Sequence, residues 1–503
     1  MTDIVIFTTG VFDMLHINHI RFLERAKQYG NYFIVGLCSD KLTESYKRTP
    51  IFNYEQRYTM LKQLNMIDEI VKLEVDTNHR PIQFYKDKKI KYQIQIDCDK
   101  HNYTRKEINF IFIKPSFGLH TSNIINKLKN NITNVCLIGG TSTTHYLSSI
   151  LGEKLNYNVN VLTRNPKLWH NNIKVYDHDN NCICTGNINI ISDKPEDVIP
   201  NCDIIIISVP SFAIKEIILK IKPYIKDNMI IGKLPGTGGF DWLCKEYLDC
   251  KNITIFGTQR LPFIVRNIEY GKSCKVFGHK KKNMFSCIPY SQSSIVQKHL
   301  QDILTYECIP LENYLNITLV PSNPILHPSR LYTLFCNWTH CIQYDKPIKF
   351  YEDWDHESYL NLKGCDNEVQ EICKHIPNIS ILPIKDAFIY NYEDDIIDKT
   401  NLLTIIKTNK SFQGINTPMI KIDNKYVPDF KSRYLLEDIP YGLAIIKSIA
   451  LLFNIDTPYI NKILLWGQKI INKEYLVDNK LVGKNVKELN IPQNFNIMTK
   501  EQL

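Results

Sequence analysis

Short apolar runs of strand length alternate with stretches of helical periodicity through the first two thirds of the chain. The first run, 4–7, ends near a glycine, and apolar residues then recur at helical spacing over 19–27. The run 203–209 is apolar almost throughout, which is typical of a parallel strand buried on both faces. The pattern therefore predicts an α/β protein. Further strands are expected at 32–38, 70–73, 93–96, 134–138, 158–162 and 229–234.

The last third of the chain shows helical periodicity and predicts an all-α domain. Its helices are expected at 355–360, 366–376, 445–453 and 459–469, and the Asn/Lys-rich stretch 380–415 is expected to be a loop or an insertion. At about 150 residues per domain, 503 residues suffice for three domains. We place these domains at 1–130, 132–320 and 321–503.

Composition narrows the classes of partner. The formal charge of +9 comes from scattered lysines without a dense basic block, which fits small anionic substrates and does not indicate a nucleic-acid surface. No apolar run approaches the roughly 20 residues of a membrane helix, and the chain starts directly with a strand instead of a signal peptide. The 15 cysteines lack zinc-site spacing. We expect a cytoplasmic protein with reduced cysteines, no membrane segment and no metal site built from its own side chains.

Two histidines stand at the start of the first predicted helix. His16 and His19 are three residues apart, so that their imidazoles can face one ligand. A helix start also offers unpaired N–H groups and a partial positive charge. The arrangement suits a phosphate, although an ordinary strand–helix turn with two surface histidines would look similar.

The residues around these histidines form the pattern G-x-F-D-x-x-H-x-x-H, from Gly10 to His19. The pattern resembles the signature of the cytidylyltransferases, of the glycerol-3-phosphate type in particular. Asn18 stands where that family has glycine, and Asn is among the least costly replacements at a left-handed position. The resemblance implies a Rossmann-like nucleotidyltransferase domain in which His16 and His19 stabilise charge on the α-phosphate of CTP, with Mg²⁺ on the triphosphate.

The resemblance extends over about residues 1–130 and implies a set of nucleotide-binding residues. Asp97 replaces a glycine of the family and Pro115 replaces an arginine, so turnover is less certain than nucleotide binding. The nucleotide-binding residues that it implies are Thr9, Gly10, Phe12, Asp13, Lys47, Arg57, Asp99, Gly118, Thr121 and Ser122.

A second glycine-rich turn follows the strand 134–138. A dinucleotide fold needs such a turn to place pyrophosphate at a helix start, and only the first glycine of G-x-G-x-x-G is kept. Arg164 follows the next strand, where an acidic residue would bind the ribose of NAD, so NADP is favoured over NAD. The expected cofactor-binding residues are Gly139, Gly140, Thr141, Thr144, Arg164 and Pro210.

Three later motifs resemble the octopine/nopaline (opine) dehydrogenases: Q-R-L-P-F-I-V-R at 259–266, N-P-I-L-H-P at 323–328 and R-Y-L-L-E-D-I-P-Y-G-L at 433–443. The resemblance implies an NAD(P)-binding Rossmann domain followed by a helical dehydrogenase domain. His327 and Asp438 match the catalytic pair of that family, and Asn323 and Arg433 are expected to bind substrate. The sequence alone leaves Glu437 open as the carboxylate instead of Asp438. The resemblance also allows a homodimer.

Taken together, these motifs predict a bifunctional enzyme that acts on small molecules. One part would transfer CMP from CTP to a phosphate ester. The other would use NAD(P)H to reduce an imine formed from a 2-oxo acid and an amine, or a related carbonyl. Two alternatives stay open: an active dehydrogenase with an inactive, nucleotide-binding regulatory domain, and a non-enzymatic nucleotide-binding scaffold.

Overall fold

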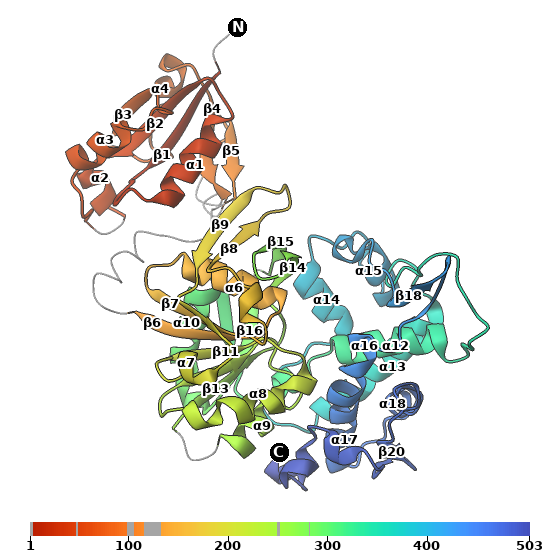
Figure 1. The fold of residues 1–503 in the computed structure, drawn as a ribbon. Coiled ribbons are helices and arrows are strands. Elements are labelled where there is room, and N and C mark those ends of the chain that lie inside the picture. The colour runs from red at the N-terminus through yellow and green to blue at the C-terminus, as the bar shows by residue number, and fades with distance from the viewer. Residues whose placement is uncertain (1–3, 47–48, 98–104, 115–131, 249–251, 281) are drawn as a thin grey trace.

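The computed structural model describes residues 4–46, 49–97, 105–114, 132–248, 252–280 and 282–503. Figure 1 shows three parts in chain order: a small sheet with its helices, a larger sheet with helices on both faces, and a helical part. This arrangement confirms the predicted α/β class, with two Rossmann-like regions followed by a helical region.

The first sheet has five parallel strands in the order β3-β2-β1-β4-β5. Alternate residues of β1 point to opposite faces, because Ile6 packs with Leu23 while Phe7 packs with Tyr85. The strands are β1 Val5–Gly10, β2 Tyr32–Cys38, β3 Glu69–Leu73, β4 Ile90–Ile96 and β5 Phe110–Ile113. The helices are α1 Ile17–Lys27, α2 Asp40–Glu44, α3 Tyr54–Lys62 and α4 Ile82–Asp87. The order of winding reverses between β1 and β4, which opens a crevice at the carboxyl ends of these strands.

The second sheet has the order β10-β7-β6-β11-β12-β13-β16-β17, in which β10 to β13 are parallel and β16 is antiparallel to β13. Its winding reverses between β6 and β11. The strands are β6 Thr133–Ile138, β7 Tyr157–Leu162, β10 Ile190–Ser192, β11 Ile204–Ile207, β12 Ile230–Lys233, β13 Thr254–Thr258, β16 Lys282–Ile288 and β17 Glu307–Pro310. The helices are α6 Ser142–Gly152, α7 Pro195–Val198, α8 Ile214–Ile221, α9 Phe240–Tyr247 and α10 Ser293–Leu304.

A four-stranded sheet, which the sequence did not predict, packs beside α6 in the order β14-β15-β8-β9. Its strands are β8 Asn172–Tyr176, β9 Cys182–Asn187, β14 Phe263–Glu269 and β15 Ser273–His279. The β8–β9 hairpin extends toward the first part of the chain (Figure 1). Close to this hairpin, Arg21 of α1 forms an ion pair with Glu153, the residue after α6, at 2.5 Å. The ion pair thus joins the first two parts of the molecule.

The helical part has one large core and differs from the prediction at two places. Residues 356–373 form one helix instead of two. Gly364 lies inside this helix, where the ring of Tyr459 packs so closely that a Cβ would not fit. Residues 380–415 include two helices with buried faces instead of a loop. The helices are α11 Leu315–Thr318, α12 Asn323–Phe335, α13 His356–Cys373, α14 Ile384–Tyr392, α15 Leu402–Thr408, α16 Arg433–Leu436, α17 Ala444–Leu452 and α18 Pro458–Ile470. Two small hairpins join them, β18 Met419–Ile422 with β19 Lys425–Pro428 and β20 Leu476–Val477 with β21 Lys480–Leu481.

Across the described ranges, no helix is both long enough and apolar enough to pass through a membrane.

Candidate active sites

The two histidines of the first motif lie together at the start of α1. The imidazoles of His16 and His19 are stacked, with ring centroids 3.8 Å apart and planes 18° apart. The ring of Phe12 meets His19 edge-on at 5.4 Å. Phe12 and Met14 both have a φ of 51°, so the turn between β1 and α1 is tightly bent. This bend carries both imidazoles to the carboxyl end of β1, beside the crevice with β4.

Neighbouring residues fix the shape of this turn. Gly10 is required because a Cβ there would come within 2.7 Å of the Phe12 ring. The Oγ of Thr9 accepts a hydrogen bond of 2.8 Å from Gln95, which joins β1 to β4 at the crevice. Both carboxylate oxygens of Asp13 accept backbone N–H groups, from Ile51 and Phe52, at 3.0 Å. Asp13 therefore holds the loop before α3 against the turn.

Arg57 occupies a different place from the one we expected. Its side chain is fully buried. It donates to the backbone carbonyls of Phe52, Val11 and Cys38 and to the carboxylate of Asp40, at 2.6–3.0 Å. The guanidinium therefore ties the walls of the crevice together from behind and does not open toward a triphosphate.

Asn18 also differs from the expectation. It is the second residue of α1 and has helical backbone, so no left-handed conformation has to be accommodated there. The other expected nucleotide-binding residues, Lys47, Asp99, Gly118, Thr121 and Ser122, lie outside the described residues.

The second glycine turn lies where the winding of the large sheet reverses. Gly139 has a φ of 125°, and a Cβ there would meet the carbonyl oxygen of Ser208 at the end of β11. Thr141, at the position of the second motif glycine, caps α6 and also meets the hydroxyl of Ser208 at 2.7 Å. Thr144, at the third position, is buried one turn later. The two threonines thus occupy the glycine positions of the motif, one as the cap of α6 and one buried in its first turn.

The edges of this turn carry the other expected cofactor residues. Arg164 is exposed at the carboxyl end of β7, and Pro210 follows β11. The sequence did not single out Tyr270, whose hydroxyl lies against Gly140 and 3.5 Å from the hydroxyl of Thr163. Tyr270 follows β14 on the added four-stranded sheet, so only the fold could reveal this proximity.

The histidine of the motif at 323–328 and the aspartate of the motif at 433–443 meet in the helical part. His327 of α12 and Asp438, just after α16, are 111 residues apart in sequence, yet their Nδ1 and Oδ2 atoms are 2.8 Å apart. The ring of Tyr434 stacks on His327 at 3.7 Å with planes 6° apart. Burial raises the pKa of Asp438, and the hydrogen bond to His327 opposes that effect. Because Asp438 holds Nδ1, Nε2 is the ring nitrogen that can serve a substrate.

The adjacent carboxylate, Glu437, has a separate set of partners. One oxygen accepts from the backbone N–H and the hydroxyl of Ser211 on the Rossmann side, both at 3.0 Å. The other accepts from Nε and Nη2 of Arg433, at 3.1 and 3.0 Å. Although burial raises the pKa of Glu437, Arg433, Lys233 and Ser211 together hold it below the ordinary value. Geometry therefore distinguishes Asp438, the partner of His327, from Glu437, which joins the two parts.

Two expected substrate residues lie at the surface of this region. Asn323 is exposed at the first turn of α12, and the side chain of Arg433 is 71% exposed while it pairs with Glu437. The sequence did not single out Lys233, which is 2% exposed at the end of β12 and donates to the carbonyl of Pro235. Burial lowers the pKa of Lys233 to about 8.

A cavity of about 1100 Å³ lies between the Rossmann side and the helical part. Residues of β14, β15 and α14 line it, together with residues near the ends of these elements and residues within 410–415. Arg266 on its wall acts electrostatically on Tyr434, the residue stacked on His327, so the cavity is coupled to the pair of His327 and Asp438 although neither residue lines it.

Comparisons with known proteins agree with this geometry. A family model for the α-helical domain of NAD/NADP octopine/nopaline dehydrogenase matches residues 310–471. A tauropine dehydrogenase of Arabella iricolor is 30% identical over 395 residues, which cover 73% of this chain and 98% of that protein. The chain belongs to the octopine/nopaline dehydrogenase family. A solved octopine dehydrogenase with NADH and L-arginine is 27% identical, with a TM-score of 0.66, and covers 73% of this chain and 96% of that one.

The first part matches a different family. A cytidylyltransferase-like family model matches residues 7–225 and so continues past the first sheet into the second. An FAD synthase of Picrophilus torridus is 47% identical over 66 residues, which cover 13% of this chain and 48% of that protein. The chain is thus an opine dehydrogenase family member, and an NAD(P)-dependent oxidoreductase by family, with a cytidylyltransferase-like domain in its first part.

Proposed function

We propose that the second and third parts condense a 2-oxo acid with an amine and reduce the resulting imine at the expense of NAD(P)H. The buried pair of His327 and Asp438 is the observation that carries this proposal. The cavity of about 1100 Å³, whose wall residue Arg266 acts electrostatically on Tyr434 beside His327, has room for two small substrates. NAD(P)H, when bound, supplies the hydride. Its binding residues would be those of the turn at 139–144, with Arg164 beside the adenosine ribose.

The chemistry assigns a defined role to each group at this site. The amine nitrogen attacks the carbonyl carbon, the carbonyl oxygen leaves as water, and the imine carbon receives the hydride. Nε2 of His327 would donate a proton to the imine nitrogen, which makes the imine carbon a better hydride acceptor. Asp438 holds Nδ1–H and stabilises the imidazolium. Arg433 would orient the carboxylate of the 2-oxo acid.

The test is the oxidation of NADH and NADPH with pyruvate and a panel of amines. We expect oxidation only when both substrates are present, and a secondary amine whose mass equals both substrates minus water plus two hydrogens. His327→Ala should abolish it, whereas His375→Ala, an exposed histidine of the same part, should not. Oxidation that needs only the 2-oxo acid would contradict the condensation.

We also propose that the first part transfers CMP from CTP to a small phosphate ester. The observation that carries this proposal is the stacked pair of imidazoles at the start of α1, beside the crevice between β1 and β4. An oxygen of the ester phosphate would attack the α-phosphorus of CTP, and the α–β bond would break to release pyrophosphate. His16 and His19 would stabilise the charge that develops on the α-phosphate. Mg²⁺ would arrive on the triphosphate as part of the substrate.

The test is transfer of label from CTP labelled at the α-phosphate to a panel of phosphate esters that includes glycerol 3-phosphate. ATP in place of CTP tests the base. His16→Ala should stop transfer, whereas His79→Ala, a histidine of the same part with a side chain 80% exposed, should not. Binding of CTP without transfer to any ester would support the regulatory alternative.

A further inference from the structure

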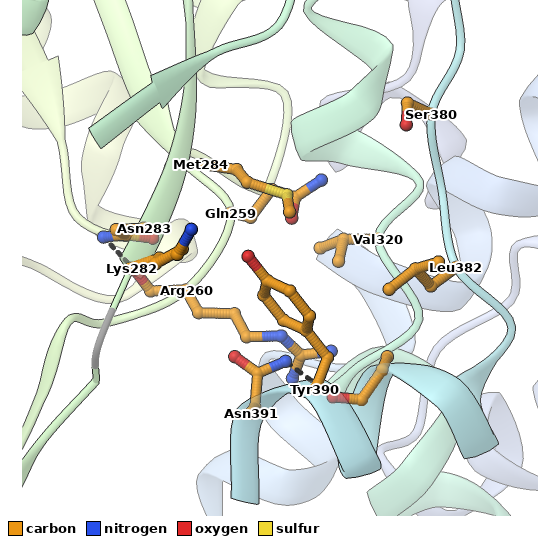
Figure 2. A pocket seen from close by; sticks show the side chains of 11 residues that line it. Gln259, Arg260, Lys282, Asn283, Met284, Val320, Ser380, Leu382, Tyr390 and Asn391 are labelled. Atoms are coloured by element: carbon orange, nitrogen blue, oxygen red, sulfur yellow. Dashed lines mark hydrogen bonds between the residues drawn. The ribbon is translucent and has the colours of Figure 1, made fainter. Parts of the chain in front are cut away.

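Two cations have no acidic partner among the residues that the structure describes. Arg260 lines a pocket of about 30 Å³, and Lys280 lines the large cavity that adjoins it. The cavity and the pocket share Tyr390 and Asn391 of α14 among their lining residues. Figure 2 shows the Arg260 side chain extending from the strand side of the pocket toward Tyr390 and Asn391.

The contacts of these two cations are with neutral groups. Nη2 of Arg260 donates to the carbonyl oxygen of Pro321 at 2.7 Å. Nζ of Lys280 lies 6.0 Å from the centre of the Tyr392 ring. Within the described ranges, no carboxylate acts appreciably on either cation. Lys282, on the rim, differs because it pairs with Glu307 at 2.8 Å.

Two neighbouring positive charges in a partly dry site are costly to maintain. Desolvation lowers the pKa of Lys280, and the nearby Arg260 lowers it further. Desolvation also lowers the pKa of Arg260. An anion between them would remove this repulsion and supply the missing hydrogen-bond acceptors. The described part of the chain supplies no such anion, so a negatively charged ligand would fit between the two cations.

The two cations lie close to the catalytic pair but are separate from it. Pro321, which holds Arg260, comes two residues before α12, the helix that carries His327. From His327, consecutive ring contacts of 3.7–5.2 Å lead to Tyr392, beside Lys280, through Tyr434, Phe350, Tyr351 and Phe412. These packed rings connect the cavity wall beside Lys280 with the catalytic pair.

We propose that Arg260 and Lys280 form an anion subsite that selects an amine substrate with a second, acidic group, either a carboxylate or a phosphate. This inference rests on the proposed condensation, because it names which amine that site takes. Carboxylates also line the cavity, but they have other partners: Glu393 pairs with Lys399 at 3.5 Å, and Asp395 accepts from Ser411 at 2.5 Å. Asp386 and Asp394 also line the cavity.

The test compares amines that differ only in the remote group, at saturating pyruvate and NADPH. L-Glutamate is compared with L-glutamine, O-phospho-L-serine with L-serine, and L-lysine supplies a remote cation. We expect the acidic member of at least one pair to have a kcat/KM about tenfold higher or more. The pair that shows this preference distinguishes a carboxylate from a phosphate. Equal values within both pairs, or preference for L-lysine, would overturn the proposal.

Substitutions of the two cations test whether the preference for an acidic amine arises at Arg260 and Lys280. Arg260→Met and Lys280→Met should each raise KM for the acidic amine about tenfold and change kcat little, while the neutral amine is unaffected. Lys298→Met, an exposed lysine of α10, is the matched control. A variant that slows all amines equally would indicate a structural role and contradict the subsite.

The proposal can fail independently of the condensation. If no amine supports NAD(P)H oxidation, the proposed function fails, and calorimetric titration of L-glutamate and O-phospho-L-serine into the NADPH-bound protein still tests the subsite. Binding that is weakened by Arg260→Met would support the subsite. Binding that is absent, or unchanged in Arg260→Met, would refute it.

Discussion

Replacing Asp438 with Asn removes the carboxylate that supports the proton on His327 while it preserves the size of the side chain. The two groups meet at 2.8 Å, and both residues are more than nine-tenths buried, so water cannot easily substitute for the lost partner. A hydrogen bond to a charged group contributes about 1.5–3 kcal/mol. Because about 1.4 kcal/mol corresponds to a tenfold change in rate, kcat for the reductive reaction should fall roughly 10- to 150-fold.

The same substitution should act mainly on kcat. Asp438 contacts the imidazole of His327 and is not expected to bind a substrate, so KM should change much less than kcat.

The assay is NAD(P)H oxidation over a range of substrate concentrations, which separates kcat from KM. Glu437→Gln is the matched control, because that carboxylate contacts Ser211 and Arg433 instead of His327. It should change KM but change kcat much less. An Asp438→Asn protein that melts at the temperature of the parent and keeps its kcat would refute the reasoning.

Three further predictions concern Lys233, Arg57 and Arg164. Burial lowers the pKa of Lys233 from 10.5 to about 8. Between these two pH values the unfolded chain holds a proton on Lys233 that the folded protein has released, so the free energy of unfolding should rise with pH. In denaturant titrations, Lys233→Met should remove up to about 3 kcal/mol of that rise. Arg57→Met leaves three carbonyls and Asp40 without their donor and should destabilise the first part by about 3–5 kcal/mol. Hydrogen exchange should show this as a loss of amide protection in the first part. Full protection would contradict the prediction. Arg164→Ala should raise KM for NADPH about tenfold and leave KM for NADH within about twofold, and equal effects on both would remove the case for NADP.

Much of the strand pattern could be predicted, because buried parallel strands are almost continuously apolar. The predicted strand 32–38 coincides with β2, and 134–138 and 158–162 fall within β6 and β7. β5 was not predicted, since the four residues of Phe110–Ile113 are too few to show a period. The helices over 380–415 were missed because polar residues dominate their exposed faces, and only the packing of Phe388 and Ile405 reveals them.

The residues of the candidate sites could likewise be predicted only in part from the sequence. The resemblance of two motifs to the opine dehydrogenases was enough to name His327 and Asp438 as a candidate pair, but only the fold shows that Asp438, and not Glu437, meets the imidazole. Arg57 shows the reverse case, because the motif suggested a ligand contact and the burial of the side chain indicates support of the loop. Arg260 and Lys280 carry no sequence signal as a pair, since they follow β13 and β15, strands of two different sheets that only the fold brings near one another.

The claim that one chain holds two separate enzymes is tested most directly by measuring both activities in two single variants. Pyrophosphate release from CTP with a phosphate ester, and NAD(P)H oxidation with a 2-oxo acid and an amine, would be assayed in parallel for the parent, His16→Ala and His327→Ala. We expect His16→Ala to lose only the first activity and His327→Ala to lose only the second, because the two histidines lie in different parts of the fold. Absence of pyrophosphate release from the parent with every ester, or loss of both activities in either folded variant, would contradict the account.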